Sequence, residues 1–114
     1  MLTREQILSV EDIKTEEVHV PEWGGTVRVA SMSGAARDRF ELSCVAADGS
    51  QDNENIRAKV VAASVVDESG NLMFSAEDVE ALGRKSAAAL DRVFEASQRL
   101  SRISNADVEE LAKN

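Results

Sequence analysis

Residues 16–34 have the sequence EEVHVPEWGGTVRVASMSG, and the order of their apolar side chains decides the fold. Polar or charged residues separate the valines within each half of this stretch, which are Val18, Val20, Val27 and Val29. This period of two predicts two half-buried β-strands. Between them, Pro21 cannot donate a ladder hydrogen bond, and the pair Gly24 and Gly25 can adopt positive φ. The stretch therefore predicts a short antiparallel β-hairpin.

After the hairpin the apolar spacing changes to that of a helix. Residues 33–47 begin with Ser33, a good N-cap, and continue with residues of one face four or three apart, which are Ala36, Phe40, Cys44 and Ala47. A polar loop at 48–53 separates this helix from a second one predicted over 54–63. Apolar residues at 65–66 and 72–74 flank the segment DESGN at 67–71, which predicts a second tight hairpin or at least a reversal, with Gly70 where a turn needs positive φ.

Helix starts are marked by a Ser or Thr followed three residues later by Asp or Gln, with apolar residues on both sides. This pattern is a capping box with a hydrophobic staple. It occurs four times, at Thr3/Gln6, Ser9/Asp12, Ser75/Asp78 and Ser104/Asp107. We therefore expect one or two short helical turns in the first 15 residues. From Ser75 we expect helix to the end of the chain, with a bend near Gly83.

The C-terminal helix carries an apolar stripe whose members are four and three residues apart in alternation: Leu82, Ser86, Ala89, Val93, Ala96, Leu100 and Ile103. Such a stripe suits either the core of its own domain or a seam with a partner helix. Leu90 and Phe94 widen the stripe, which favours the core. The fold class predicted is α+β and mostly helical, with N-terminal helical turns, a small antiparallel hairpin and a helical C-terminal half. We expect one domain over 1–114, with a helix and hairpin part at 1–32 and a helical part at 33–114.

Composition excludes several classes of function. The 114 residues include 13 basic and 21 acidic side chains, and the net charge of −8 opposes binding to nucleic acid or to anionic lipid. The longest apolar stretch, 60–66, is far shorter than the roughly 20 residues of a membrane span. We expect a cytosolic protein, because one cysteine forms no internal disulfide and the first residues have no signal-peptide pattern. Residues 84–104 are locally basic, and acidic and basic surfaces in one chain suit a homo-oligomer.

No catalytic or metal-binding pattern is found. Cys44 is far in sequence from His19, the only histidine, and we expect a small buried side chain at Cys44 and a solvent-facing one at His19. One cysteine and one histidine are too few for a zinc site, and the loop at 48–59 lacks the glycine and glutamate of a calcium loop. We therefore expect no enzyme, metal or cofactor. Trp23 is either an exposed anchor for a partner or a cover for the hairpin.

The order of these features resembles the tail assembly chaperones of long-tailed bacteriophages. The resemblance covers residues 7–103, and its most specific parts are VPEWGG at 20–25 and SVVDESGNLMFSAEDVEAL at 64–82. It implies a protein of the host cell cytoplasm that binds the tape measure protein, keeps it soluble while the tail tube protein polymerises around it, and is absent from the virion. It also implies the short product of a frameshifted pair, whose longer product recruits tube subunits.

A helical client suggests where contact occurs. An amphipathic, alanine-rich helix can cover apolar client surface. The predicted contact residues are Trp23, Val93, Ala96, Leu100 and Ile103. The alternative function is a minor structural or connector protein that stays in the tail.

Overall fold

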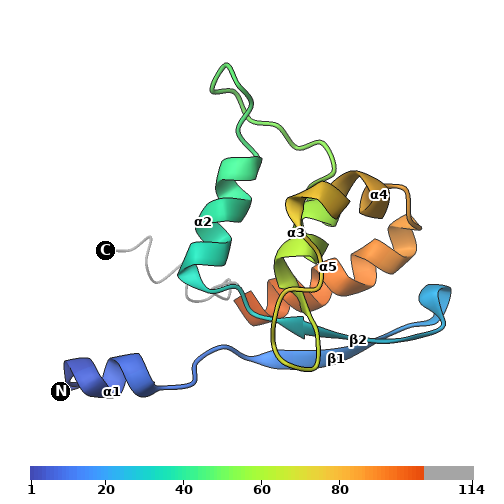
Figure 1. Ribbon diagram of the computed structural model, residues 1–114. Coiled ribbons are helices and arrows are strands. Elements are labelled where there is room, and N and C mark those ends of the chain that lie inside the picture. The colour runs from blue at the N-terminus through green and yellow to red at the C-terminus, as the bar shows by residue number, and fades with distance from the viewer. Residues whose placement is uncertain (102–114) are drawn as a thin grey trace, which may run out of the picture.

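The computed structural model describes residues 1–101, which form an α+β fold with a three-stranded antiparallel sheet and a helical C-terminal half (Figure 1). The elements in chain order are α1 (Arg4–Ser9), β1 (Thr15–Val20), the 3₁₀ turn η1 (Pro21–Trp23), β2 (Gly25–Ala30), α2 (Gly34–Ser43), α3 (Ile56–Ser64), β3 (Val65–Val66), the 3₁₀ turn η2 (Ala76–Asp78), α4 (Val79–Gly83) and α5 (Ala87–Ser101). The predicted fold class is confirmed. The division of one domain at residue 32 stays a prediction.

The predicted hairpin consists of β1, η1 and β2. Val18 lies opposite Val27 and Val20 lies opposite Gly25 in the antiparallel register. The turn closes where the backbone N–H of Gly24 donates to the Pro21 carbonyl at 3.0 Å, with Gly24 at φ 73°. Val65 and Val66, the apolar pair that precedes the second predicted hairpin or reversal, form β3. The pairing of β3 with β2, which places Val65 opposite Val29, is not predicted from the sequence. Only two residues long, β3 is too short to show a period in the sequence.

The reversal at DESGN is confirmed. Val66 and Leu72 form an antiparallel bridge, and the N–H of Asp67 donates to the Asn71 carbonyl at 2.8 Å. Gly70 has φ 84°, as the turn requires. The Asp67 carboxylate accepts from the N–H groups of Ser69 and Asn71 at 2.8 and 3.1 Å, so this side chain stabilises the turn from inside.

Two of the four predicted capping boxes start helical segments. Thr3 caps α1, and Ser75 caps η2, where its N–H donates to Asp78 Oδ2 at 2.9 Å. The prediction at Ser9 is wrong: α1 ends there, the next residue is extended, and the Ser9 hydroxyl donates back to the Glu5 carbonyl at 2.7 Å. A serine that bonds back to its own helix caps no new one. The box at Ser104 lies outside the described residues.

Helix boundaries differ from the predictions at two further places. Ser33 caps α2 as predicted, but α2 ends at Ser43 and not at residue 47, because Val45 turns to form a bridge with Gln51. The helix predicted over 54–63 is confirmed as α3 with slightly shifted ends. The C-terminal region is not one bent helix, because residues 84–86 separate α4 from α5. The hydroxyl of Ser86 instead accepts from the Ala89 N–H at 3.3 Å, near the start of α5.

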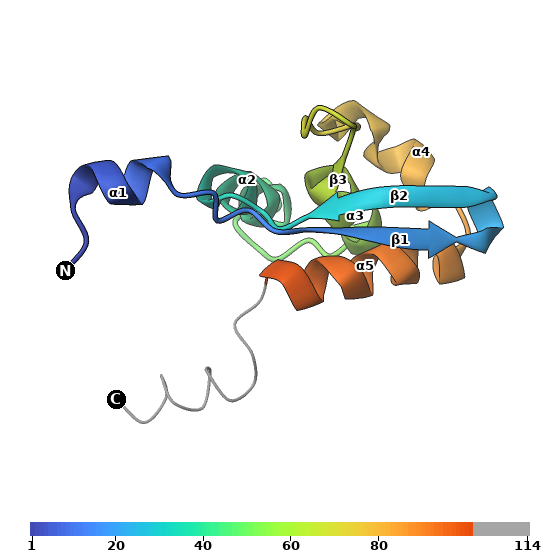
Figure 2. The same ribbon diagram turned by 90° about the horizontal axis from the view of Figure 1, so that it is seen from below.

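Helices α2 to α5 gather on one face of the sheet, and the core lies between them and the hairpin (Figures 1 and 2). Its fully buried valines come from the sheet, from α3 and from α5: Val20, Val29, Val65, Val61 and Val93. α1 lies outside this arrangement. It projects beyond the start of β1, away from the helices (Figure 2).

Candidate binding surfaces

Most of the predicted contact residues on α5 fill the core. Val93 and Ala96 are 0% exposed, and Leu100 is half-buried and packs against the same cluster. Ile103 lies outside the described residues. Client contact by these residues stays a prediction, and for Val93 and Ala96 it requires α5 to leave the sheet. In the folded chain this stripe packs in the core of its own domain, which is the alternative that the widening by Leu90 and Phe94 favours.

Trp23 is the last residue of η1 and packs against the core cluster while remaining half-buried. Of the two alternatives, the fold therefore shows the cover over the hairpin. The remaining exposure leaves part of this residue at the surface, where an indole suits a protein contact.

The basic surface of α5 is paired with acidic residues of the same chain. Arg99 Nη2 lies 3.0 Å from Glu16 Oε1 of β1, and Arg92 Nε lies 2.9 Å from Glu22 Oε1 of η1. The hydrogen bond from Arg92 lowers the pKa of Glu22 below its ordinary value. A third pair joins Arg57 of α3 to Asp91 of α5. These pairs attach α5 to the hairpin and to α3. Some of the opposite charges that were expected to favour a homo-oligomer are therefore paired within one chain.

The residues considered for catalysis lie apart. His19 is exposed on β1, and Cys44 is buried at the end of α2, as predicted for both. Across residues 1–101 no three His, Cys, Asp or Glu side chains come together as metal ligands. None of the helices described there has the length and apolar character to span a bilayer.

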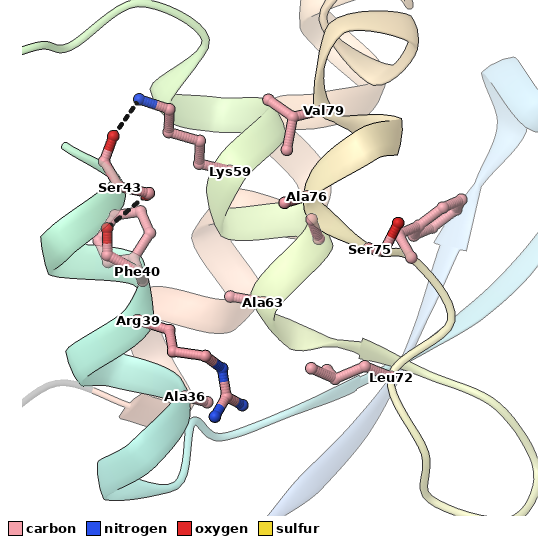
Figure 3. Close-up of a pocket in the computed structure, with 12 residues that line it drawn as sticks. Ala36, Arg39, Phe40, Ser43, Lys59, Ala63, Leu72, Ser75, Ala76 and Val79 are labelled. Atoms are coloured by element: carbon pink, nitrogen blue, oxygen red, sulfur yellow. Dashed lines mark hydrogen bonds between the residues drawn. The ribbon is translucent and has the colours of Figure 1, made fainter.

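An apolar hollow lies between α2, α3 and η2, and we call it the α2–α3 hollow (Figure 3). Its volume is about 340 Å³. Its apolar lining consists of four alanines and four larger residues: Ala36, Ala62, Ala63, Ala76, Phe40, Leu72, Phe74 and Val79. Two cations stand at its rim, Arg39 on α2 and Lys59 on α3. Lys59 Nζ donates to the Ser43 carbonyl at 2.8 Å, which ties the two helices together at one end.

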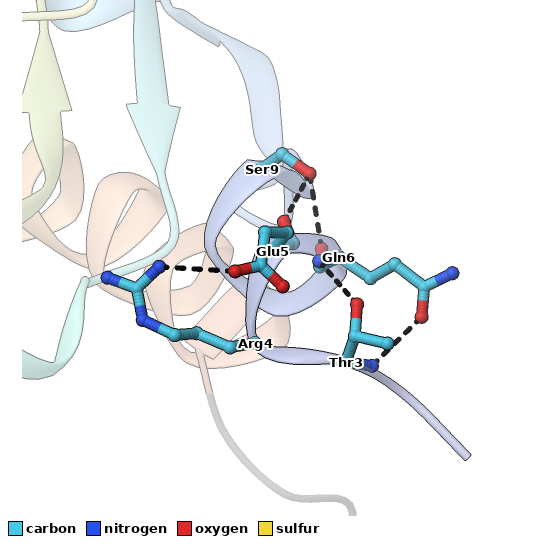
Figure 4. A network of polar contacts seen from close by, with 5 residues as sticks. All are labelled: Thr3, Arg4, Glu5, Gln6 and Ser9. Atoms are coloured by element: carbon cyan, nitrogen blue, oxygen red, sulfur yellow. Dashed lines mark hydrogen bonds and ion pairs between the residues drawn. The ribbon is translucent and has the colours of Figure 1, made fainter.

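The second exposed apolar surface is the segment 1–14, which we call the N-terminal arm. The arm contains α1, which buries none of its residues. A reciprocal capping box stabilises this short helix: Gln6 N–H donates to Thr3 Oγ1 at 3.2 Å, and Thr3 N–H donates to Gln6 Oε1 at 2.9 Å (Figure 4). Six large apolar residues of the arm are exposed: Met1, Leu2, Ile7, Leu8, Val10 and Ile13.

Sequence reasoning missed both surfaces. The hollow consists of residues from three separate segments, and no local pattern connects them. The arm had a signal, because Leu2, Ile7 and Leu8 stand in a highly charged stretch where no second apolar segment follows closely enough to cover them. By itself, that spacing predicts only the hydrophobic staples of helix starts.

Comparison with known proteins identifies the family. The family model described as "Phage tail assembly chaperone" matches residues 3–114. The structure is similar to the bacteriophage HK97 tail assembly chaperone, with a TM-score of 0.61 and 18% identity over 89% of this chain and 95% of that chain. At this identity the structural likeness shows a shared fold. No curated protein sequence matches. Since the family model covers nearly the whole sequence, the chain belongs to the phage tail assembly chaperone family.

Proposed function

We propose that this chain binds the tape measure protein of its phage, keeps that protein soluble and promotes assembly of the tail tube around it. The observation that carries the proposal is the family match over residues 3–114. The proposed role is binding, with no catalysed reaction and no cofactor. The chain acts in the host cell cytoplasm and is absent from the mature virion.

The physical properties of the chain support this role. A client with long apolar helices aggregates unless apolar surface is covered, and the cover must itself remain in solution. A net charge of −8 provides solubility. Exposed apolar residues provide contacts, and several copies along one client act through effective concentration. The tail tube protein is then reached through the longer frameshifted product.

The predicted contact set of Trp23, Val93, Ala96, Leu100 and Ile103 is carried forward as part of the proposal. Among the described members, Trp23 and Leu100 are half-buried, so a client can reach them with the smallest change in fold. Replacing Leu100 and Ile103 with Asp is expected to abolish client binding while the circular dichroism spectrum stays native. Loss of the native spectrum would instead assign these residues to the core and overturn this part of the contact set. Leu42→Asp is the matched control, because Leu42 is 72% exposed on α2, away from this set.

The test is co-expression with the tape measure protein of the same phage, followed by affinity pull-down and light scattering of the soluble fraction. Soluble co-purification in a multi-copy complex is expected. A tape measure protein that stays insoluble beside a soluble chain would overturn the proposal. Purified particles are then probed for the chain. Its presence there in many copies would favour the alternative, a minor structural or connector protein retained in the tail.

A further inference from the structure

We propose that α2 is a displaceable cover and that an amphipathic helix of the tape measure client takes its place on α3. This inference rests on the proposed function, because it names the surface where the client binds. It differs from the contact set on α5, since displacement of α2 leaves the core cluster intact.

α2 contributes almost nothing to the core. Eight of its ten residues are exposed, Ala36 alone is buried, and Phe40 is half-buried. In the part of the chain that the structure describes, neither α2 nor the loop 44–55 that follows it supplies a residue to the core cluster. A helix that buries so little apolar surface separates from the body at a small cost in free energy.

The contact between α2 and α3 is loosely packed. Phe40 stands in this contact, and three cavities adjoin its ring. One is the α2–α3 hollow (Figure 3). The second has a volume of about 410 Å³ and is also lined by Cys44 and Ile56, and the third, of about 60 Å³, is also lined by Val60. Empty space beside a side chain removes dispersion contacts that close packing would provide, so the cover is held weakly.

Polar bonds at both ends hold α2 in place. Near its start, Met32 N–H donates to Ser101 Oγ at 3.0 Å, and Arg37 Nη1 donates to the Ser101 carbonyl at 3.4 Å. At its end, Lys59 Nζ donates to the Ser43 carbonyl at 2.8 Å. Bonds at a wet surface contribute little net stability, because water competes for both partners. They set the position of α2 without locking it.

The face of α3 beneath α2 is suited to a helix. The α3 residues on this face are three or four apart and line the cavities around Phe40: Ile56, Lys59, Val60 and Ala63. Such spacing forms one side of a helix. Leu72 and Val79 line the hollow from the segments after β3 (Figure 3). Removal of α2 therefore turns the hollow into an open apolar groove with α3 as its floor.

α2 itself indicates which partner this groove accepts. It places Ala36 and Phe40, a small and an aromatic residue four positions apart, at the groove, and its last carbonyl group accepts from Lys59. A client helix with the same spacing reproduces these contacts, and a cation suits the C-terminal end of any helix. The ligand class is therefore an amphipathic helix, in agreement with the proposed client.

The cover gives the free chain a closed state. Val60 is 1% exposed and Ala62 8% exposed while α2 is in place. The client binds only the open state, so each contact that holds α2 lowers the apparent affinity for the client. Weakening the cover therefore strengthens client binding.

Cys44 reports the position of α2 without an introduced label. It directly follows α2 and is buried beside Phe40. The rate at which a small thiol reagent modifies Cys44 is measured in the absence of denaturant. Phe40→Ala is expected to raise this rate roughly tenfold, because its half-buried ring holds the cover. Leu42→Ala, at a position 72% exposed on α2, is the matched control and is expected to leave the rate unchanged.

Val61→Ala separates displacement of α2 from global unfolding. Val61 is 0% exposed in the core cluster, so its truncation weakens the whole fold and not the cover. Cys44 in this variant is expected to react at the rate of the unmodified chain. A rate that rises as much as in Phe40→Ala would mean that only global unfolding exposes Cys44, and it would refute a displaceable cover.

Client capture is measured by diluting the tape measure protein from denaturant into buffer that contains the chain and following light scattering. Phe40→Ala is expected to prevent aggregation at a lower concentration than the unmodified chain, and client binding is expected to speed the modification of Cys44. Weaker capture by Phe40→Ala, or protection of Cys44 by the client, would mean that the client binds the closed face and would contradict the proposal.

A cleavable tether tests the displacement directly. In a Cys44→Ala background, a short disulfide-containing bismaleimide linker joins Ser43→Cys to Lys59→Cys and holds α2 on α3. The tether is expected to abolish client capture, and its cleavage is expected to restore the level of the unlinked variant. The control tether joins Arg57→Cys to Asp91→Cys, positions whose native side chains form an ion pair between α3 and α5, and is expected to have no effect.

The outcomes distinguish this site from the function. Capture that survives the tether on α2 overturns the site on α3 and keeps the proposed function. Loss of capture with the control tether alone would assign the client to the contact set on α5. Dimers that appear as the modification of Cys44 speeds up would assign the groove to α2 of a second copy. A chain that neither prevents aggregation nor co-purifies with the client overturns the proposed function and this site with it.

Discussion

Arg92 of α5 and Glu22 of η1 are 70 residues apart in sequence, yet Arg92 Nε donates to Glu22 Oε1 at 2.9 Å and Nη2 donates to Oε2 at 3.3 Å. This two-bond geometry fixes the hairpin turn against the last described helix. It also stabilises the ionised carboxylate, so the pKa of Glu22 is lowered from its ordinary 4.5.

The lowered pKa predicts a pH dependence of stability. A carboxyl group with a depressed folded-state pKa stabilises the fold above its unfolded-state value, and this contribution is lost as the pH falls through the folded-state pKa. Thermal unfolding of Glu22→Gln and of the unmodified chain is measured from neutral pH down to about pH 3. We expect a lower Tm for the variant near neutral pH and a difference that shrinks below pH 4.5.

Glu5→Gln is the control for this titration, because Glu5 pairs only with its neighbour Arg4 at 3.5 Å and both side chains are more than 70% exposed. Its Tm is expected to follow that of the unmodified chain at every pH. A Glu22→Gln variant with the same Tm as the unmodified chain throughout would show that the Arg92 contact does not stabilise the hairpin.

The burial of Val93 predicts a large loss of stability on truncation. Val93→Ala removes two methyl groups from a site that is 0% exposed, and we expect the free energy of unfolding to fall by roughly 2 kcal/mol. Val45→Ala, at a position 50% exposed, is the matched control and is expected to change it by less than about 0.5 kcal/mol. Urea unfolding measures both. Equal losses would contradict the placement of Val93 in the core.

The sequence predicted those features that depend on neighbours in the chain. Val18 and Val27 showed the strand period, Ser33 and Ser75 marked helix starts, and Gly70 marked the reversal; each depends on local backbone chemistry. The prediction failed at Ser9, where the same cap pattern occurs at the end of a helix and its hydroxyl bonds backwards. When two cap patterns lie six residues apart, as at Thr3 and Ser9, the patterns alone do not specify which of the two helices forms.

The binding surfaces could not be predicted from the sequence, for a different reason. Phe40, Ala63 and Leu72 line one hollow only because the packing of α2 on α3 and the turn after β3 bring them together. The stripe containing Val93 was visible, but periodicity is the same for a helix that faces its own sheet and for one that faces a partner. Only the placement of α5 on the sheet separates these alternatives.

Gly70 predicts a conformational cost. Its φ of 84° is strained for a residue with a side chain, although no atom lies within 4 Å of an added Cβ. Gly70→Ala is therefore expected to destabilise the chain by about 1 kcal/mol through backbone strain alone. Gly70→Asn is the control, since asparagine tolerates left-handed backbone better, and its loss is expected to be smaller. Chemical denaturation ranks the two, and an order with asparagine worse would contradict strain as the cause.

The capping residues Thr3 and Ser33 predict different consequences for the same chemical change. Ser33 Oγ accepts from the Ala36 N–H at 3.1 Å and caps α2, which packs on α3 as part of the folded body. Ser33→Ala is expected to lower the free energy of global unfolding by about 1 kcal/mol. Thr3 caps α1, which buries nothing, so Thr3→Ala is expected to unfold α1 locally and to leave global unfolding within about 0.5 kcal/mol.

Hydrogen exchange at α1 and urea unfolding together measure this contrast. Faster exchange confined to α1 in Thr3→Ala, with an unchanged urea midpoint, is the expected result. Global destabilisation by Thr3→Ala in dilute, monomeric chain would instead mean that α1 packs on the body of its own copy, and it would contradict the projection of the arm.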